Sequence, residues 1–352
     1  MDSKKIFAIV AVIVIALGAV VAVVIVQNNN EKYDLSVAYL EKNSYETQMV
    51  ADSKGFFDDS GVKVKGVTVT GSGQDAVNKL LAGEVDIAAT GQGPVANTFH
   101  NYADDLVVIC GVNHSTGGQV WVAKIAGLTP YDSSTDNKAA VKESFKTVSG
   151  DGANPIKFGL QQDATTASEF KGWLKAMDIP FIDFDATPAG GEYVKLVHYK
   201  ANTLVPTLAA GTIDAMAASQ PFPSKALSTV SGTYQIGSNA DVNSYDLSMY
   251  ITTKKVYDEK KELIEKFISG LDKASKYMAN AENKDECIEI CNNVINNRDA
   301  VVEAFKIAKW KTDWSDDMAN TLYKTCTKKK YTEITLDMCK DKCLFKDYIA
   351  TL

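Results

Sequence analysis

An uninterrupted apolar run near the amino terminus is the feature that most constrains this chain. The run covers 21 residues, from Ile6 to Val26, and directly follows Lys4 and Lys5. A helix that rises about 1.5 Å per residue would span roughly 30 Å over this length, the thickness of the hydrocarbon core of a bilayer. Lysines that precede a membrane span favour the cytoplasmic side. We therefore expect a cytoplasmic tip at residues 1–5, a transmembrane anchor at 6–26 and a linker at 27–33.

A cleaved signal peptide is the alternative interpretation of the same run. The apolar region of a signal peptide is usually about 7–15 residues long and precedes a cleavage site of small residues. Here the run ends at Val26 and continues into Gln27 and three asparagines, and no cysteine for a lipid anchor lies nearby. The sequence favours a single-pass protein of the cell membrane with an extracytoplasmic carboxy-terminal body.

The body behind this run is large and acidic. Lysine and arginine number 37 against 44 aspartates and glutamates, which gives a net charge of −7. A nucleic-acid partner is disfavoured, because no basic stripe is present to displace counterions from a phosphate backbone. A body of about 320 residues is more than one hydrophobic core usually organises, so two lobes are expected.

Strand and helix patterns alternate along this body. Residues 62–70 alternate apolar and polar side chains, which is typical of a strand, and residues 74–81 place their apolar residues on one helical face. A further helix is expected to open at Pro94, near its first turn. This order predicts α/β lobes with largely parallel sheets. The other expected strands are 35–40, 85–89, 106–109, 120–123, 156–160, 181–185, 213–217 and 245–252, and the other expected helices are 45–53, 139–145, 165–177, 204–210 and 259–278.

One phrase of the sequence occurs twice. Residues 81–88 read LAGEVDIA and residues 208–215 read LAAGTIDA, each at the passage from an expected helix to an expected strand. Two similar units of this kind indicate two lobes that are built alike. We expect the first lobe at residues 34–124, the second at 125–245, and a return to the first lobe at 246–352, together with a helical carboxy-terminal region that contains cysteines.

Small polar residues and glycines follow several of the expected strands. In open α/β sheets a ligand binds at the carboxyl ends of the strands, where helix amino termini present free N–H groups. The alternative interpretation of each segment is an ordinary capped helix start. As a set divided between two lobes, they predict a ligand-binding cleft. The three segments are Gly71–Gly73, Thr90–Gly91–Gln92–Gly93 and Gln161–Thr166.

Signals of catalysis are weak. The chain has three histidines, and it has no G-x-S-x-G elbow, G-x₄-G-K-[ST] phosphate loop or H-E-x-x-H metal motif. We expect no catalytic residue, no metal and no cofactor. His114 follows a strand and is retained as a candidate ligand-binding residue.

Six cysteines in an extracytoplasmic chain favour disulfides. Cys110 lies in an apolar run and is expected to be a buried thiol, whereas the other five cluster late. The pairs Cys287/Cys291 and Cys339/Cys343 have i,i+4 spacing, which places the Cβ atoms of a helix about 5–6 Å apart, beyond the ~3.8 Å of a disulfide. Bridges between the two segments are therefore favoured over bridges within them. A four-thiolate metal site and free thiols are the alternatives.

Several segments resemble one family. Residues 49–64 read MVADSKGFFDDSGVKV, residues 71–73 read GSG and residues 80–94 read LLAGEVDIAATGQGP. They resemble solute-binding proteins of ABC importers, in particular the nitrate, sulfonate and taurine group, which also contains thiamine-pyrimidine binders. Residues 204–221 resemble the second-lobe counterpart. The resemblance covers about residues 35–256 and leaves out the carboxy-terminal cysteine region.

This resemblance implies a type II periplasmic-binding-protein fold, in which two α/β lobes close on a ligand by a hinge motion. The crossing strands would fall near Lys124 and between Gln220 and Tyr245. No arginine stands at the implied contact positions, so an anion would rely on helix amino termini and neutral donors. By position in the family's motifs, the implied ligand contacts are Tyr39, Ser72, Gly73, Thr90, Gln92, Thr165, Thr166 and Gln220.

The function implied is a non-catalytic receptor that delivers a small anion or zwitterion, such as a sulfonate, taurine or nitrate, to an ABC permease. The alternatives are a binding protein for pyrimidine precursors, an enzyme on the same fold that resembles thiamine-pyrimidine synthases, and a sensor ectodomain. Those enzymes are cytoplasmic and carry a cysteine cluster that this chain lacks, and a sensor needs a cytoplasmic output module larger than residues 1–5.

Overall fold

The computed structural model describes residues 32–352. The predicted tip, the predicted anchor at 6–26 and most of the predicted linker lie outside the described residues. Within the range that is described, no helix has both the length and the apolar character needed to cross a membrane. Residues 35–352 form one compact unit, and this unit contains two sheets.

The first sheet has six strands in the order β12-β4-β11-β3-β1-β2. Strands β1, β2 and β3 are parallel, whereas β11 runs antiparallel to both β3 and β4. The sheet is therefore mixed rather than largely parallel as predicted. Strand β11 re-enters this sheet from the side where the parallel strands end, so it has to run against them. The strands are β1 (Leu35–Tyr39), β2 (Val64–Thr68), β3 (Ile87–Gly91), β4 (Leu106–Ser115), β11 (Asp246–Thr253) and β12 (Trp310–Asp313).

The second sheet also has six strands, in the order β10-β5-β9-β6-β8-β7. Strands β6, β7, β8 and β9 are parallel, and β5 runs antiparallel to β9 and β10. The two sheets thus share a plan of parallel strands bordered by one strand that arrives from the other lobe. The strands are β5 (Gln119–Ala123), β6 (Ile156–Leu160), β7 (Phe181–Ile182), β8 (Val194–His198), β9 (Ala215–Ser219) and β10 (Tyr234–Ser238).

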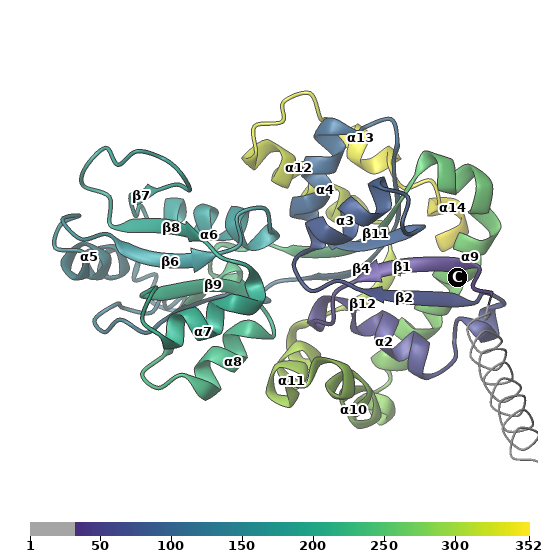
Figure 1. The fold of residues 1–352 in the computed structure, drawn as a ribbon, viewed down its shortest axis with the longest axis horizontal. Coiled ribbons are helices and arrows are strands. Elements are labelled where there is room, and N and C mark those ends of the chain that lie inside the picture. Colours follow the sequence, from purple (N-terminus) through teal and green to yellow (C-terminus); the bar gives the residue numbers. More distant parts are fainter. Residues whose placement is uncertain (1–31) are drawn as a thin grey trace, which may run out of the picture. The chain divides into compact units, whose positions relative to one another are not determined.

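Helices cover both sheets, and Figure 1 shows each sheet at the centre of its lobe. The first lobe carries α2 (Glu46–Ser53), α3 (Gly73–Leu81), α4 (Gln92–Asn101), α9 (Lys254–Ala279), α10 (Lys284–Ile295), α11 (Arg298–Ile307), α12 (Asp316–Lys328), α13 (Leu336–Asp341) and α14 (Lys346–Ile349). The second lobe carries α5 (Lys138–Val148), α6 (Thr165–Ala176), α7 (Leu204–Ala209) and α8 (Phe222–Thr229).

Two segments connect the lobes. Residues 116–118 lead from β4 to β5, and residues 239–245 lead from β10 to β11. The predicted boundary at residue 124 places β5 with the first lobe, whereas β5 pairs in the second sheet. Asn239 joins the two connections, because its Oδ1 accepts hydrogen bonds from the N–H groups of Gly117 and Gln119 at 2.9 and 3.2 Å.

The repeated phrase of the sequence has the same role in each lobe. Its aspartate is Asp86 between α3 and β3, and Asp214 between α7 and β9. Asp86 Oδ2 accepts a hydrogen bond from the N–H of Ser36 on β1 at 2.8 Å, and Asp214 Oδ2 accepts one from the N–H of Lys157 on β6 at 2.8 Å. The repeat therefore attaches the entry of one strand to its neighbour, and its aspartates are structural.

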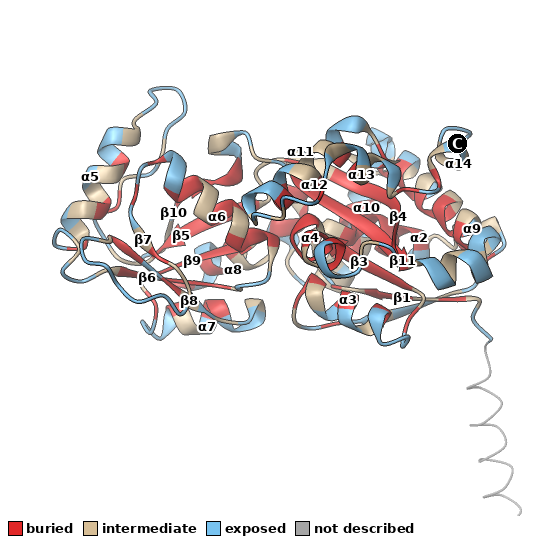
Figure 2. Cartoon of the chain, turned by 90° about the horizontal axis from the view of Figure 1, so that it is seen from above, coloured by how far each residue is buried: buried red, intermediate tan, exposed pale blue. Residues whose placement is uncertain are grey.

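Each lobe has its own apolar core, and the central strands of the sheets are largely buried (Figure 2). In the second lobe the core is aromatic: Trp121 on β5 packs against Phe170 and Trp173 of α6, with ring centroids 5.0 and 6.5 Å apart. Most predicted elements are confirmed within a few residues, including β6 at 156–160 and α6 at 165–176. Strands β8, β10 and β12 and helix α8 were not predicted.

The structure does not bring together the two cysteine segments that were predicted to be bridged. All six cysteines are free and buried. Cys287 and Cys291 lie on α10, which packs on α2, whereas Cys339 lies on α13, which packs on α12 and through it on α4. These elements cover opposite faces of the first sheet (Figure 1), so the sheet separates the two segments. The spacing along the chain carried no information about this separation.

Candidate functional site

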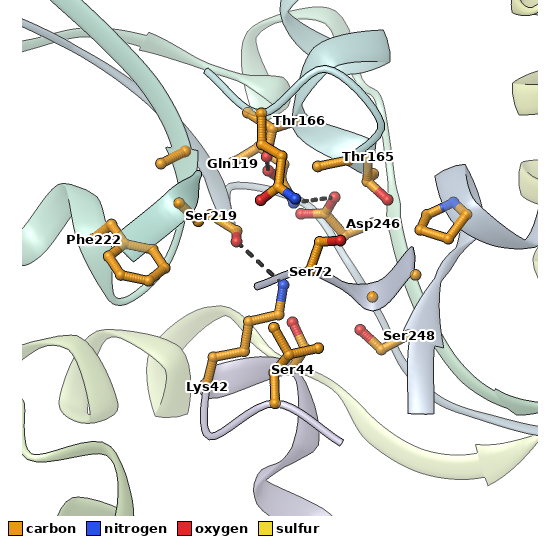
Figure 3. A pocket seen from close by; sticks show the side chains of 18 of the residues that line it. Lys42, Ser44, Ser72, Gln119, Thr165, Thr166, Ser219, Phe222, Asp246 and Ser248 are labelled. Carbon is orange, nitrogen blue, oxygen red and sulfur yellow. Dashed lines mark hydrogen bonds between the residues drawn. The ribbon is translucent and has the colours of Figure 1, made fainter. Parts of the chain in front are cut away.

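A cavity of about 60 Å³ lies between the two lobes, and side chains of both lobes line it (Figure 3). Because one water molecule needs about 10–15 Å³ on this measure, the cavity has room for roughly four to six groups of water size. Its polar lining is dense for so small a space. The lining residues with polar side chains are Lys42, Ser44, Tyr45, Ser72, Gln92, Gln119, Gln161, Thr165, Thr166, Ser219, Asp246 and Ser248.

Three helices begin at this cavity. Helices α3 and α4 of the first lobe start at Gly73 and Gln92, and α6 of the second lobe starts at Thr165. The first turn of each helix has N–H groups without partners inside the helix, and it carries a partial positive charge. Ser72 caps α3, with its Oγ accepting a hydrogen bond from the N–H of Gln74 at 3.2 Å. The electrostatic potential at this end of each helix favours a negatively charged ligand group.

The backbones of the two lobes come close together at the start of α4. The N–H of Gly93 donates a hydrogen bond to Thr165 Oγ1 at 3.2 Å. A Cβ atom at position 93 would lie 2.9 Å from the backbone nitrogen of Thr165, and one at position 91 would lie 2.8 Å from its Oγ1. Glycine is therefore required here for close approach of two backbones.

Lys42 supplies the cation of the cavity. It follows β1 at the carboxyl end of the strand, and its side chain is half-buried. Over residues 32–352 the only hydrogen bond of its Nζ is to the neutral Ser219 Oγ of the second lobe, at 3.4 Å (Figure 3). Burial lowers the pKa of Lys42, and the nearby Asp246 opposes this effect. A desolvated ammonium with one long contact to a neutral group is poorly compensated. A bound anion would balance its charge.

A chain of hydrogen bonds runs beside Lys42 from one lobe to the other. The Thr166 hydroxyl of α6 donates to Gln119 Oε1, and Gln119 Nε2 donates to Asp246 Oδ1 at 3.0 Å. Asp246 is the first residue of β11, where the chain re-enters the first lobe. Burial raises the pKa of Asp246 to about 7, and the neighbouring Glu169 adds to the rise.

Asp246 should therefore make the stability of the protein depend on pH. A folded-state pKa of about 7 lies above the ordinary value of 3.8, so the folded state favours the protonated carboxyl. The benefit is fully present below about pH 4 and is lost as the pH rises to 7. Asp246→Asn should remove this loss of unfolding free energy. At about 1.4 kcal/mol per pKa unit, the loss is worth up to about 4 kcal/mol.

Urea unfolding at pH 4, 5.5 and 7 measures this difference. We expect the free energy of unfolding of the wild type to fall with pH more steeply than that of Asp246→Asn. Asp104→Asn alters an exposed aspartate of a loop and should retain the wild-type slope. Equal slopes for the wild type and Asp246→Asn would contradict the assignment.

Six of the predicted ligand-binding residues line the cavity: Ser72, Gly73, Gly91, Gln92, Thr165 and Thr166. Gln92 is already engaged with the re-entering strand, because its Oε1 accepts from the N–H of Leu247 and its Nε2 donates to the carbonyl of Tyr245, both at 2.9 Å. Its side chain therefore fixes the second connection between the lobes.

The other predicted residues do not line the cavity. Tyr39 packs against Gly66 on β2, because side chains alternate along β1 and the next residue, Leu40, faces the cavity instead. Thr90 is buried behind Gly73, and Gly93 contacts Thr165 through its backbone.

His114 and Gln220 lie farther away. His114 Nε2 is 2.9 Å from Thr321 Oγ1 of α12, and burial lowers the pKa of His114. Gln220 Oε1 accepts a hydrogen bond from the Ser224 hydroxyl at 2.9 Å, and its side chain borders a smaller adjoining cavity of about 30 Å³.

Sequence reasoning missed Lys42, Ser44, Gln119, Ser219, Asp246 and Ser248, which all line the cavity. Lys42 and Ser44 follow β1, and Ser219 ends β9, so the rule of strand carboxyl ends would have found them. Gln119 and Asp246 begin strands, and no local signal distinguishes them. Among residues 32–352 no cluster of three or more potential metal ligands occurs.

The carboxy-terminal region also bridges the lobes. Lys328, at the end of α12, places its Nζ 3.3 Å from Glu169 Oε1 on α6 and 3.1 Å from Ser244 Oγ. Glu169 is almost fully buried, at 1% exposed. Lys328 lies outside the segment that resembled a known family, so the late region of the chain contributes to the contact between the lobes.

Solved structures with the same architecture are numerous. The chain is similar to the periplasmic nitrate-binding protein NrtA from Synechocystis, with 14% identity, a TM-score of 0.68 and coverage of 90% of this chain and 87% of that one. It is similar to the periplasmic aliphatic sulphonate-binding protein SsuA from Escherichia coli, with 14% identity, a TM-score of 0.64 and coverage of 87% and 90%. A Candida albicans protein described as having the generic periplasmic binding protein fold gives 14% identity, a TM-score of 0.63 and coverage of 88% and 94%.

At these identities the similarity establishes the fold, which is an α/β periplasmic-binding-protein fold with two mixed sheets. No curated protein sequence matches the chain. The resemblance to binding proteins of ABC importers is confirmed. The chain belongs to the NMT1-like family, whose model matches residues 28–292.

Proposed function

We propose that this protein is an extracytoplasmic solute-binding protein that delivers a small anion or zwitterion to an ABC permease. The observation that carries the proposal is the half-buried Lys42 ammonium, which faces a neutral hydroxyl of the opposite lobe beside three helix amino termini. In this arrangement both lobes contribute groups that stabilise a negative charge on the ligand. A ligand held in this way favours the closed arrangement of the lobes, because it contacts both.

The size and chemistry of the cavity limit the ligand. Room for roughly four to six water-sized groups suits nitrate or a short sulfonate or carboxylate. Ser72 and Thr165, together with Gly73 and Gly91, offer hydroxyl and backbone donors around Lys42. Asp246 offers an acceptor for a cationic group, so a zwitterion fits as well. The similarity to nitrate-binding and sulphonate-binding proteins supports the same classes of ligand.

The proposal includes a membrane tether at residues 6–26, a type II arrangement and a hinge at the two connecting segments. The connections at 116–118 and 239–245 are short and joined by Asn239, which suits a small rotation of one lobe against the other. A tethered receptor stays close to its permease, which raises its effective concentration there.

Calorimetry on the folded protein tests the proposal. The ligands are nitrate, taurine, short alkanesulfonates and pyrimidine precursors of thiamine, each titrated at low and high salt. We expect heat of binding from one small anion or zwitterion, with weaker binding at high salt because the contact is electrostatic. No heat from any of these ligands, with folding verified by circular dichroism, would count against the proposal.

A further inference from the structure

Two cysteines of the carboxy-terminal region lie on two helices that pack against each other. Cys326 lies in the last turns of α12 and Cys339 lies on α13, with residues 327–338 between them. Both side chains are fully buried, and the two thiols lie close enough to influence each other. Helices α12 and α13 pack against each other, so the contact belongs to the core of this region.

The remaining four cysteines are placed differently. Cys287 and Cys291 are one helical turn apart on α10, a spacing too wide for a disulfide within a regular helix. The Cys343 thiol donates a hydrogen bond to the carbonyl of Ile109 at 3.2 Å, so its sulfur is directed at a strand backbone. Cys110 lies within β4.

We propose that Cys326 and Cys339 form a disulfide bond in the functional protein. The proposal rests on the extracytoplasmic location proposed above, where thiols meet oxidants. It replaces the bridges that the spacing of the cysteines had suggested, because it pairs residues that the tertiary structure brings together.

The reaction is thiol–disulfide exchange with a disulfide oxidant, either a protein oxidoreductase or oxidised glutathione. One cysteine loses its proton and attacks a sulfur of the oxidant, which forms a mixed disulfide and releases one thiol. The second cysteine loses its proton and attacks the protein sulfur of that mixed disulfide, which releases the other thiol. The two cysteines are thus oxidised by two electrons, and the oxidant is reduced to two thiols.

The bond should form before α13 packs against α12. The pKa of Cys339 is raised by the hydrogen bond with Cys326 and by burial, so the folded pair contains little of the reactive thiolate. Burial also keeps an oxidant from reaching either sulfur. Oxidation of the folded, reduced protein should therefore be slow, and oxidation during refolding should be fast.

The bond would stabilise the segment that bridges the lobes. Lys328, two residues after Cys326, contacts Glu169 of α6. The following loop packs on α4, where the ring of Tyr331 stacks on that of His100 with centroids 4.1 Å apart. Closing this loop covalently lowers the entropy of its unfolded state, so the ion pair to the second lobe would be presented by a more ordered segment.

Thiol trapping after refolding tests the proposal. The full-length chain is unfolded in reductant, refolded in a glutathione redox buffer, blocked with N-ethylmaleimide in denaturant and mapped by mass spectrometry without reduction. We expect peptides linked through Cys326 and Cys339 in most molecules, with the other four cysteines alkylated. Six alkylated cysteines at every glutathione ratio, or a link between other cysteines, would overturn the proposal.

Variants provide the controls. Cys326→Ser and Cys339→Ser should each abolish the linked peptide and leave the partner alkylated, whereas Cys287→Ser should retain the link. Reductant should lower the midpoint of thermal unfolding of the wild type by several degrees. It should leave the midpoint of a double variant, with both Cys326→Ser and Cys339→Ser, unchanged. The wild-type map decides the question even if a variant fails to fold. It is also independent of the calorimetry, since the link can form in a protein that binds none of the ligands titrated.

Discussion

Lys42→Met is expected to lower the affinity for an anionic ligand by about 10- to 100-fold. A hydrogen bond to a charged group is worth roughly 1.5–3 kcal/mol, and every 1.4 kcal/mol or so changes affinity tenfold. Methionine retains the length of the side chain and removes its charge. Since the Lys42 ammonium has one contact of 3.4 Å to Ser219 and burial lowers its pKa, the variant should fold at least as stably as the wild type.

Calorimetry with the best ligand of the wild type measures the affinity, and thermal unfolding verifies the fold. Lys65→Met removes an exposed lysine from β2 of the same lobe and should leave the affinity unchanged. The salt dependence of binding should also become weaker in Lys42→Met, because one charge has left the site. Wild-type affinity and salt dependence in this variant would exclude Lys42 from the site.

Gly93→Ala is expected to hold the lobes apart and to lower ligand affinity by at least about tenfold. The new Cβ would lie 2.9 Å from the backbone nitrogen of Thr165 and 3.0 Å from its Cα. Both atoms belong to α6 of the opposite lobe and cannot rotate away, so overpacking of about 1–3 kcal/mol falls on the closed arrangement. Within its own lobe the substitution places alanine in the first turn of α4, which favours the helix.

Small-angle scattering and calorimetry together test this expectation. The wild type should become more compact with saturating ligand, whereas Gly93→Ala should retain a larger radius of gyration. Gly172→Ala is the control: Gly172 lies on α6, the helix that Gly93 of α4 faces, and a Cβ there would meet Lys328 Nζ at an ordinary 3.8 Å. Unchanged compaction in Gly93→Ala would show that this glycine does not limit closure.

Local patterns predicted most of the fold. The alternation in residues 62–70 and the apolar face of residues 165–177 are properties of single segments, and they correspond to β2 and α6. The missed strand β12 has four residues and exists as a strand because it pairs with β4. The formation of such a short edge strand depends on its partner strand, which lies far away in the chain.

The site was predicted only in part, because some of its residues follow a local pattern and others depend on contacts between distant segments. Ser72, Thr165 and Thr166 stand at the start of helices that follow strands, and this order can be recognised from the sequence. Gln119 and Asp246 stand at the start of β5 and β11, where the chain crosses between lobes. Their hydrogen bond at 3.0 Å depends on two crossings that meet, and the spacing of 127 residues between them gives no indication of it.

The sequence by itself determined the two repeated lobes, their α/β class and the donor-rich turns, because periodicity and capping act over a few residues. Only the tertiary structure decided which donors share one cavity, that Gly93 contacts Thr165, and that the helix of Cys326 packs on the helix of Cys339. These contacts depend on how the sheets and their covering helices are placed. That placement results from the packing of whole elements, which no short segment encodes.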